Sequence, residues 1–335
     1  MVLEICLFMG LIQVSTGYQE VLIKKEKEMI EQKDSPKIKY YHVEKEVEED
    51  NGYQSAIEEL IHCYQSKIDY SLVNDDIKNN VNALQNLYDK SSKYFSFLYQ
   101  DLYSGFTISY NEDTPIFTAS TIKAPAMIYL YEMASEGKID LEEKLIYTSN
   151  FYHGGSGVLQ TKPVNTDYSV GQLIYYAIHD SDNIAYAMLM NRFQRENVLD
   201  FWSSKGTKHI YTLNTIWGVT SVKDASIYMN ELYRFSRENK EYGQTLMEYF
   251  KGATWKLITN KNGEFNTANK GGWSGEAIHD VAIVFDKNPY LLVIMSNTGE
   301  SNYSYLFSET SKIVGMLHES YWKYKEELCE KFRQY

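Results

Sequence analysis

The sequence lacks an excess of positive charge. Its 335 residues carry 33 lysines and arginines against 45 aspartates and glutamates, which gives a formal net charge of −12. Proteins that bind a phosphate backbone usually present a clustered basic face, and the sequence contains no such cluster. The composition therefore argues against nucleic acid as a partner.

Cysteine is also scarce. Cys6, Cys63 and Cys329 are too widely spaced to suggest a metal site. His179 and His279 lack a second histidine or cysteine at ligand spacing, so we expect structural roles for both. Because the sequence contains no glycine-rich nucleotide motif either, it implies no metal and no other cofactor.

The N-terminus lacks an apolar run long enough for a confident membrane span of roughly 20 residues. The run from Val2 to Val14 is interrupted by Glu4 and is not preceded by a basic residue. Residues 1–19 are consistent with a degenerate export signal or an anchor remnant, and equally with a short buried helix or a misplaced start codon. Residues 20–52 are rich in lysine and glutamate, which predicts a solvated spacer.

The spacing of apolar residues predicts secondary structure in the remaining chain. Helices are predicted over Tyr53–Tyr64 and Asp75–Tyr88, followed by a hairpin of Tyr94–Tyr99 and Phe106–Tyr110. From Ser120 to about Trp255 the pattern is mostly helical and shows no strand pair. Strands and a final helix are then predicted over Thr267–Ser274, Asp280–Phe285, Tyr290–Asn297 and Ser308–Phe332.

Strands at both ends with helices between them predict an α+β fold. We expect one antiparallel sheet formed from both terminal regions, with helices packed on it and an inserted all-helical subdomain. Residues 53–335 would then form one domain, in which 53–119 and 256–335 make the α/β part and 120–255 the helical subdomain. A cleft is expected between the two parts.

The stretch from Phe117 to Met133 contains the first catalytic candidate. Ser120 precedes a predicted helix over Thr121–Met133, and Lys123 lies one turn further on the same face. A serine becomes a good nucleophile when a base takes its proton, and a desolvated lysine can be that base. Taken alone, this spacing is common, and a capping serine beside a solvated lysine is the better explanation unless partners occur later in the sequence.

Two later motifs strengthen the case that Ser120 is a catalytic serine. Ser181-Asp182-Asn183 lies between two helical runs, and Lys270-Gly271-Gly272 lies in a predicted strand. Ser-x-x-Lys, Ser-Asp-Asn and Lys-Thr-Gly, in this order, mark class A β-lactamases and penicillin-binding proteins. The sequence resembles the class A β-lactamase-like serine hydrolases from about Asp75 to Phe332, and the predicted fold matches theirs.

The resemblance implies a role for each motif residue. Ser120 would be the nucleophile, Lys123 the general base and Ser181 the relay of a proton to the leaving nitrogen. Asn183 would hold the substrate amide and the Lys123 amine, and Lys270 would orient Ser181 and attract an anionic substrate. The backbone N–H groups of Ser120 and Trp273 would form the oxyanion hole. From the residues themselves, we expect Asp182 to fix its loop through backbone hydrogen bonds.

The same resemblance implies a substrate-binding wall and a disulfide. The glycine-rich loop from Tyr152 to Gln160 would border the cleft, with Tyr152, Gly155 and Ser156 in contact with substrate, as Gly271 and Gly272 would be on the opposite side. Both termini pack together in the resembled fold, so Cys63 could pair with Cys329, which would suit an exported protein.

Two departures bear on the activity. Gly271 replaces the threonine of the family, and no arginine occurs between Trp255 and Asn302 to replace its contact with a substrate carboxylate. The loop after Ser181, between Trp202 and Thr220, contains no acidic residue that could activate water for deacylation.

Three functions remain compatible with these motifs. The first is a serine hydrolase that cleaves a β-lactam or a cell-wall peptide amide through an acyl-Ser120 intermediate. The second is a D,D-peptidase or penicillin-binding protein with slow deacylation, and the third is a non-catalytic exported binding protein. We expect an extracellular or membrane-anchored location facing the cell wall of a bacterium, with membrane association through the N-terminus.

Overall fold

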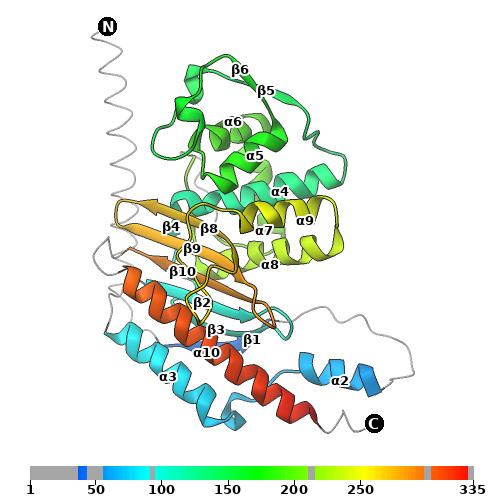
Figure 1. Cartoon of the computed structure of the whole chain (residues 1–335), viewed down its shortest axis with the longest axis vertical. Helices are drawn as coiled ribbons and strands as arrows, with labels where there is room; N and C mark the ends of the chain where they lie inside the picture. The colour runs from blue at the N-terminus through cyan, green and yellow to red at the C-terminus, as the bar shows by residue number, and fades with distance from the viewer. Residues whose placement is uncertain (1–36, 44–55, 91–94, 210–215, 298–302, 331–335) are drawn as a thin grey trace.

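A computed structural model describes residues 37–43, 56–90, 95–209, 216–297 and 303–330. They form an antiparallel sheet with one group of helices on each face (Figure 1). The predictions for residues 1–19 and for Cys6 lie outside the described residues. None of the described helices is both long and apolar enough to cross a membrane.

The main sheet has six strands in the order β1-β3-β2-β10-β9-β8, and every neighbouring pair is antiparallel. The early and late parts of the chain meet where β2 pairs with β10, as the sequence predicts for a sheet built from both terminal regions. The strands are β1 (Lys39–His42), β2 (Phe95–Asp101), β3 (Phe106–Tyr110), β8 (Thr267–Ser274), β9 (Ala277–Val284) and β10 (Tyr290–Ser296).

Strand alternation divides the core into two layers. In β10, Leu292 and Ile294 pack towards α3 (Asp75–Asp89) and α10 (Tyr303–Cys329), whereas Leu291 and Val293 face the helical part of the chain. Successive side chains of a strand point to opposite faces, so both faces of the sheet are covered. This explains why β10 reads as a continuous apolar run from Tyr290 to Met295.

The helical part lies on the other side of the sheet (Figure 1). Its helices are α4 (Lys123–Ser135), α5 (Val170–His179), α6 (Asn183–Phe193), α7 (Arg195–Ser204), α8 (Val222–Glu238) and α9 (Tyr242–Lys251). The helical part is accompanied by two short antiparallel strand pairs, β4 (Ile116–Phe117) with β7 (Val219–Thr220) and β5 (Lys144–Tyr147) with β6 (Thr166–Ser169).

Three expectations from the sequence are wrong in detail. The region 120–255 does contain a strand pair, β5 with β6. The sequence pattern did not predict it, because strands of four residues are too short to show a clear periodicity. Four residues of the predicted spacer form β1, which pairs with β3 despite the surrounding charge. The helix expected from Thr121 begins at Lys123, after a 3₁₀ turn over Ala119–Ile122.

The predicted link between the two ends of the domain is present. Cys63, in α2 (Ala56–Gln65), forms a disulfide with Cys329 at the end of α10, with their Cα atoms 5.8 Å apart. The buried Lys325 Nζ strengthens the same contact by donating to the carbonyl oxygens of Cys63 (2.7 Å) and Ser66 (2.8 Å). The disulfide and these hydrogen bonds therefore hold α2 against α10.

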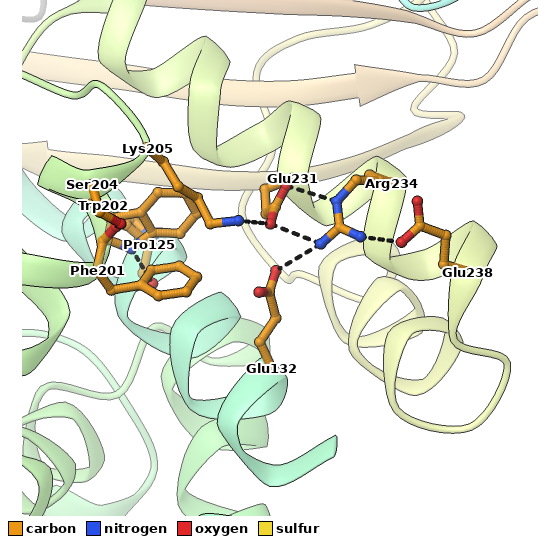
Figure 2. Close-up of polar contacts among 9 residues, drawn as sticks. All are labelled: Pro125, Glu132, Phe201, Trp202, Ser204, Lys205, Glu231, Arg234 and Glu238. Atoms are coloured by element: carbon orange, nitrogen blue, oxygen red, sulfur yellow. Dashed lines mark hydrogen bonds and ion pairs between the residues drawn. The ribbon is translucent and has the colours of Figure 1, made fainter. Parts of the chain in front are cut away.

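A charged cluster joins α4 to α8 and to the end of α7 (Figure 2). Arg234 pairs with Glu231, with Glu238 and, at 3.6 Å, with Glu132, while Lys205 also contacts Glu231. Burial, followed by the negative charge of Glu231, raises the pKa of Glu132 to about 8. Glu231 keeps its charge because its hydrogen bonds to Arg234 and Lys205 outweigh the opposing effect of burial and lower its pKa.

The raised pKa of Glu132 predicts a pH-dependent contribution to stability. A carboxyl group whose pKa is higher in the folded state binds more protons there, so the free energy of unfolding falls as pH rises from 4.5 to about 8. We expect Glu132→Gln to gain at least ~1 kcal/mol relative to the wild type across this window, after allowance for partial solvent screening. Thermal melts at both ends of the window measure this difference, with Glu248→Gln, an exposed glutamate outside the cluster, as control. A difference between Glu132→Gln and the wild type that was the same at both pH values would contradict the prediction.

Candidate active site

Ser120 lies in the tight turn that precedes α4. The turn begins at Ala119, whose φ of 43° is in the left-handed region, and this kink directs the following residues into the 3₁₀ turn. Gly272 of β8 packs directly against it, since a Cβ atom at Gly272 would lie 2.8 Å from the Ser120 backbone nitrogen. The close approach of β8 to Ser120 therefore requires glycine at position 272.

The Lys123 amine is fully buried and brings three chain segments together. Its Nζ lies 3.1 Å from Ser120 Oγ, 2.5 Å from the Ser181 carbonyl oxygen and 2.7 Å from Asn183 Oδ1. A carbonyl or amide oxygen only accepts hydrogen bonds, so the two N–H groups of a neutral amine would be directed at Ser181 and Asn183. The remaining lone pair is then available to the Ser120 hydroxyl.

The loop between α5 and α6 is held in an unusual conformation. Ser181 has a φ of 55°, a left-handed value that non-glycine residues rarely adopt. Asp182 accepts hydrogen bonds from the backbone N–H groups of Ile184 and Ala185 at the start of α6, and from that of Leu159. The prediction that Asp182 fixes its loop through backbone hydrogen bonds is confirmed.

Lys270 approaches Ser181 from the sheet. Its Nζ donates to Ser181 Oγ at 2.9 Å and to the Gly271 carbonyl oxygen at 2.8 Å. A charged lysine has three N–H groups, so Lys270 has one N–H group in addition to the two that contact these acceptors. Ser181 Oγ also lies 3.3 Å from Lys123 Nζ, which places this hydroxyl between the two lysines.

The two buried lysines have lowered pKa values. Burial lowers the pKa of Lys123 well below the ordinary lysine value of 10.5, and the nearby charge of Lys270 lowers it further. Burial also lowers the pKa of Lys270, to about 7, although the buried carboxylate of Asp280 partly opposes the shift. Lys123 is therefore the stronger candidate for an uncharged amine, and Lys270 for a cation.

The predicted glycine-rich wall lies against the Ser181 loop. Asn183 donates from its backbone N–H to the Ser156 carbonyl oxygen (3.1 Å) and from Nδ2 to that of Gly154 (2.8 Å). Gly155 is also close, because a Cβ atom there would lie 3.3 Å from Asn183 Nδ2. The Tyr152 side chain is half exposed on the same loop. This wall and the β8 residues therefore flank Ser120 and Ser181.

Gly157 lets the same loop approach Asp182. A Cβ atom at Gly157 would lie 2.3 Å from the Asp182 side chain, and Gly157 has a φ of 111°. Both observations require glycine at this position, because any larger residue would clash and would also strain the backbone.

The structure brings together the side chains of Ser120, Lys123, Ser181, Asn183 and Lys270, which the sequence selected. Trp273 follows Gly272 on β8, and its indole ring is largely exposed. The assignment of backbone N–H groups to an oxyanion hole remains a prediction, as do the catalytic roles of these residues.

His279 and His179, for which the sequence predicted structural roles, both make such contacts. The buried ring of His279 bridges the Phe117 carbonyl oxygen (2.7 Å) and the Ser296 backbone N–H (3.1 Å), and therefore joins β4 to the sheet. His179 stacks on Tyr175 and lies 3.0 Å from Asp180 Oδ1.

Two tryptophans near the site were not selected from the sequence. Lys123 Nζ lies 5.6 Å from the centroid of the Trp217 ring, which also stacks on Tyr186. The Trp255 ring lies beside Gly271, and a Cβ atom at Gly271 would be 1.9 Å from it. Neither tryptophan belongs to a motif, so only the tertiary fold reveals these contacts.

Known proteins support the assignment of the fold. The solved structure of PBP-A has a TM-score of 0.64 to this chain and 20% sequence identity, covering 72% of this chain and 96% of its own. A mutant of PBP-A was solved as an acyl-enzyme complex with penicillin G. A β-lactamase from Sphaerobacter thermophilus has a TM-score of 0.60 and 17% identity, covering 78% of this chain and 98% of its own. A β-lactamase from Chitinophaga pinensis has a TM-score of 0.62 and 16% identity, covering 73% of this chain and 98% of its own.

None of the curated proteins compared with the chain matches it. The family model described as the β-lactamase enzyme family matches residues 79–315, which are most of the chain and include all three motifs. The chain is therefore a serine hydrolase-type member of the β-lactamase enzyme family.

Proposed function

We propose that Ser120 is acylated by a β-lactam or a cell-wall peptide amide and that the acyl-enzyme is hydrolysed slowly, as in a penicillin-binding peptidase. The observation that carries the acylation step is the contact between Ser120 Oγ and the buried Lys123 amine, 3.1 Å away. The acyl-enzyme of the PBP-A mutant with penicillin G supports a β-lactam as one acyl donor.

The contacts supply a route for the proton. Lys123 Nζ takes the Ser120 proton while Oγ bonds to the carbonyl carbon of the substrate. The C–N bond then breaks, and the nitrogen leaves with a proton from the Ser181 hydroxyl, which is replaced by the proton held on Lys123 over a distance of 3.3 Å. Lys270 supports this transfer, because its N–H group occupies one lone pair of Ser181 Oγ and so directs the hydroxyl proton elsewhere.

Slow hydrolysis follows from the surroundings of Lys123. The chain carries no aspartate or glutamate between Trp202 and Thr220, and the aromatic ring of Trp217 lies beside the Lys123 amine. Among the described residues, no carboxylate is hydrogen-bonded to Ser120 or Lys123. Loss of a general base slows such a step by about 10²–10⁴-fold, so the acyl-enzyme should persist.

The location of the protein is also a proposal. A disulfide between Cys63 and Cys329 suits an oxidising compartment, and a cell-wall substrate would require an exported or membrane-anchored bacterial protein. A non-catalytic binding protein is the alternative, and the substitution of Ser120 distinguishes it from an enzyme.

The acylation proposal predicts a covalent adduct. After incubation with benzylpenicillin, the intact mass of the wild-type protein should increase by the mass of the penicillin, because ring opening loses no atoms. Ser120→Ala should form no adduct, since it lacks the nucleophilic oxygen. A wild type that forms no adduct and turns over no β-lactam would contradict the proposal and favour a binding protein.

The persistence of the adduct tests the second half of the proposal. After removal of free penicillin, the adduct should decay over minutes to hours, measured by mass at successive times. Rapid turnover of a chromogenic cephalosporin without accumulation of an adduct would show efficient deacylation and contradict slow hydrolysis.

The lysine pKa values predict a bell-shaped pH profile for acylation. The rate should rise with pH as Lys123 loses its proton and should fall above pH 7, because Lys270, with a pKa of about 7, then loses the charge that supports Ser181. Lys270→Arg should remove the alkaline decline, since arginine stays charged. Stopped-flow acylation rates that kept rising to pH 9 in the wild type would contradict a role for the Lys270 cation.

A further inference from the structure

The indole ring of Trp255 takes the place of a side chain on the substrate-facing strand. A Cβ atom at Gly271 would lie 1.9 Å from Trp255 Cε3 and 2.2 Å from Cζ3, so the ring packs directly on the backbone of β8. Trp255 is nevertheless 38% exposed. One part of the ring therefore covers Gly271, and another part is open to solvent.

The segment around Trp255 is fixed on both sides. Before it, Thr254 donates from its backbone N–H and from Oγ1 to the His179 carbonyl oxygen, at 3.0 and 2.9 Å. After it, the backbone N–H groups of Leu257 and Ile258 donate to the buried carboxylate of Asp280, at 2.8 and 3.0 Å. The ring is therefore held between the start of the Ser181 loop and β8.

This position lies on the side of the site where the leaving nitrogen is expected. Ser181 would protonate that nitrogen. Lys270 Nζ donates both to Ser181 Oγ (2.9 Å) and to the Gly271 carbonyl oxygen (2.8 Å), so the backbone of Gly271 lies close to the Ser181 hydroxyl. A group attached to the leaving nitrogen would therefore lie near Lys270, Gly271 and Trp255.

Cationic partners are scarce on this side of the site. No arginine occurs between Trp255 and Asn302. Lys256 Nζ donates to the carbonyl oxygens of Lys251 and Thr267, whereas Lys261 and Lys287 pair with glutamates of α10. Lys270 already contacts two acceptors, and burial lowers its pKa to about 7. Among these described lysines, a carboxylate beside the leaving nitrogen would thus meet one cation, Lys270, which is already shared between two acceptors.

We propose that Trp255 is a specificity-determining residue, whose exposed indole surface selects acyl donors with an uncharged apolar or aromatic group on the leaving-nitrogen side over donors with a carboxylate there. The inference rests on the acylation of Ser120 proposed above. An aromatic surface gains contact with apolar and planar groups and offers no compensation for a desolvated carboxylate. The enzyme would then react faster with neutral or esterified donors than with carboxylate-bearing ones.

Three compounds that share the same acyl group test this inference. Benzylpenicillin, its methyl ester and its benzyl ester differ only at the carboxylate beside the leaving nitrogen, and acylation of each is measured by intact mass at pH 7. The wild type should react with the methyl ester at least as fast as with the free acid, and about 3–10-fold faster with the benzyl ester than with the methyl ester, as expected for one added aromatic contact.

Trp255→Ala should abolish the advantage of the benzyl ester, and Trp255→Leu, which keeps an apolar side chain and protects the fold, should reduce it. Phe265→Ala, which removes another exposed aromatic ring outside the site, should leave the ranking unchanged. A further variant that combines Trp255→Ala with Gly271→Thr, which places a hydroxyl in the vacated space, should shift the preference towards the free acid.

The outcomes separate this inference from the proposed function. Adducts on Ser120 whose ranking is the same in the wild type and both Trp255 variants would overturn the role of Trp255 alone. A wild type that reacts faster with the free acid than with the methyl ester would overturn it as well. If none of the three compounds formed an adduct, both proposals would be overturned.

Discussion

The burial of the Lys123 amine is the constraint on which the site depends. A charged lysine without water is costly, so burial lowers the pKa of this amine, which is positioned by hydrogen bonds to the Ser181 carbonyl oxygen and to Asn183. The lowered pKa favours an uncharged amine, which is a base beside Ser120. These hydrogen bonds therefore determine the placement of the amine, and desolvation determines its reactivity.

The surrounding fold supplies the partners of this amine from distant parts of the sequence. The turn at Ala119 sets Ser120, the Asp182 cap sets the Ser181 loop, and β8 carries Lys270 to the same point. These segments belong to the sheet and to the helical part, so the packing between the two parts holds the site together. Within the helical part, the ion pair between Arg234 and Glu132 joins α8 to α4.

Much of this arrangement was predictable from the sequence, because local patterns encode it. The sequence predicted β8 and β3 at their observed bounds, and ordered motifs predicted that Ser120, Ser181 and Lys270 would meet. The short strands β5 and β6 contain too few residues for a periodic signal. The contacts of Trp217 and Trp255 with the site depend on tertiary packing, and the sequence gives no local indication of which aromatic residues lie near a lysine or a glycine.

The charge of Lys123 is the most direct test of this account. In protein with ¹³C- and ¹⁵N-labelled lysine, NMR of the side-chain resonances, assigned with Lys123→Arg, reports the protonation of each amine. The account predicts that Lys123 loses its proton at a pH well below that of an ordinary lysine, whose pKa is 10.5. A Lys123 resonance that stays that of an ammonium through about pH 10 would contradict the proposal that this residue is the base for Ser120.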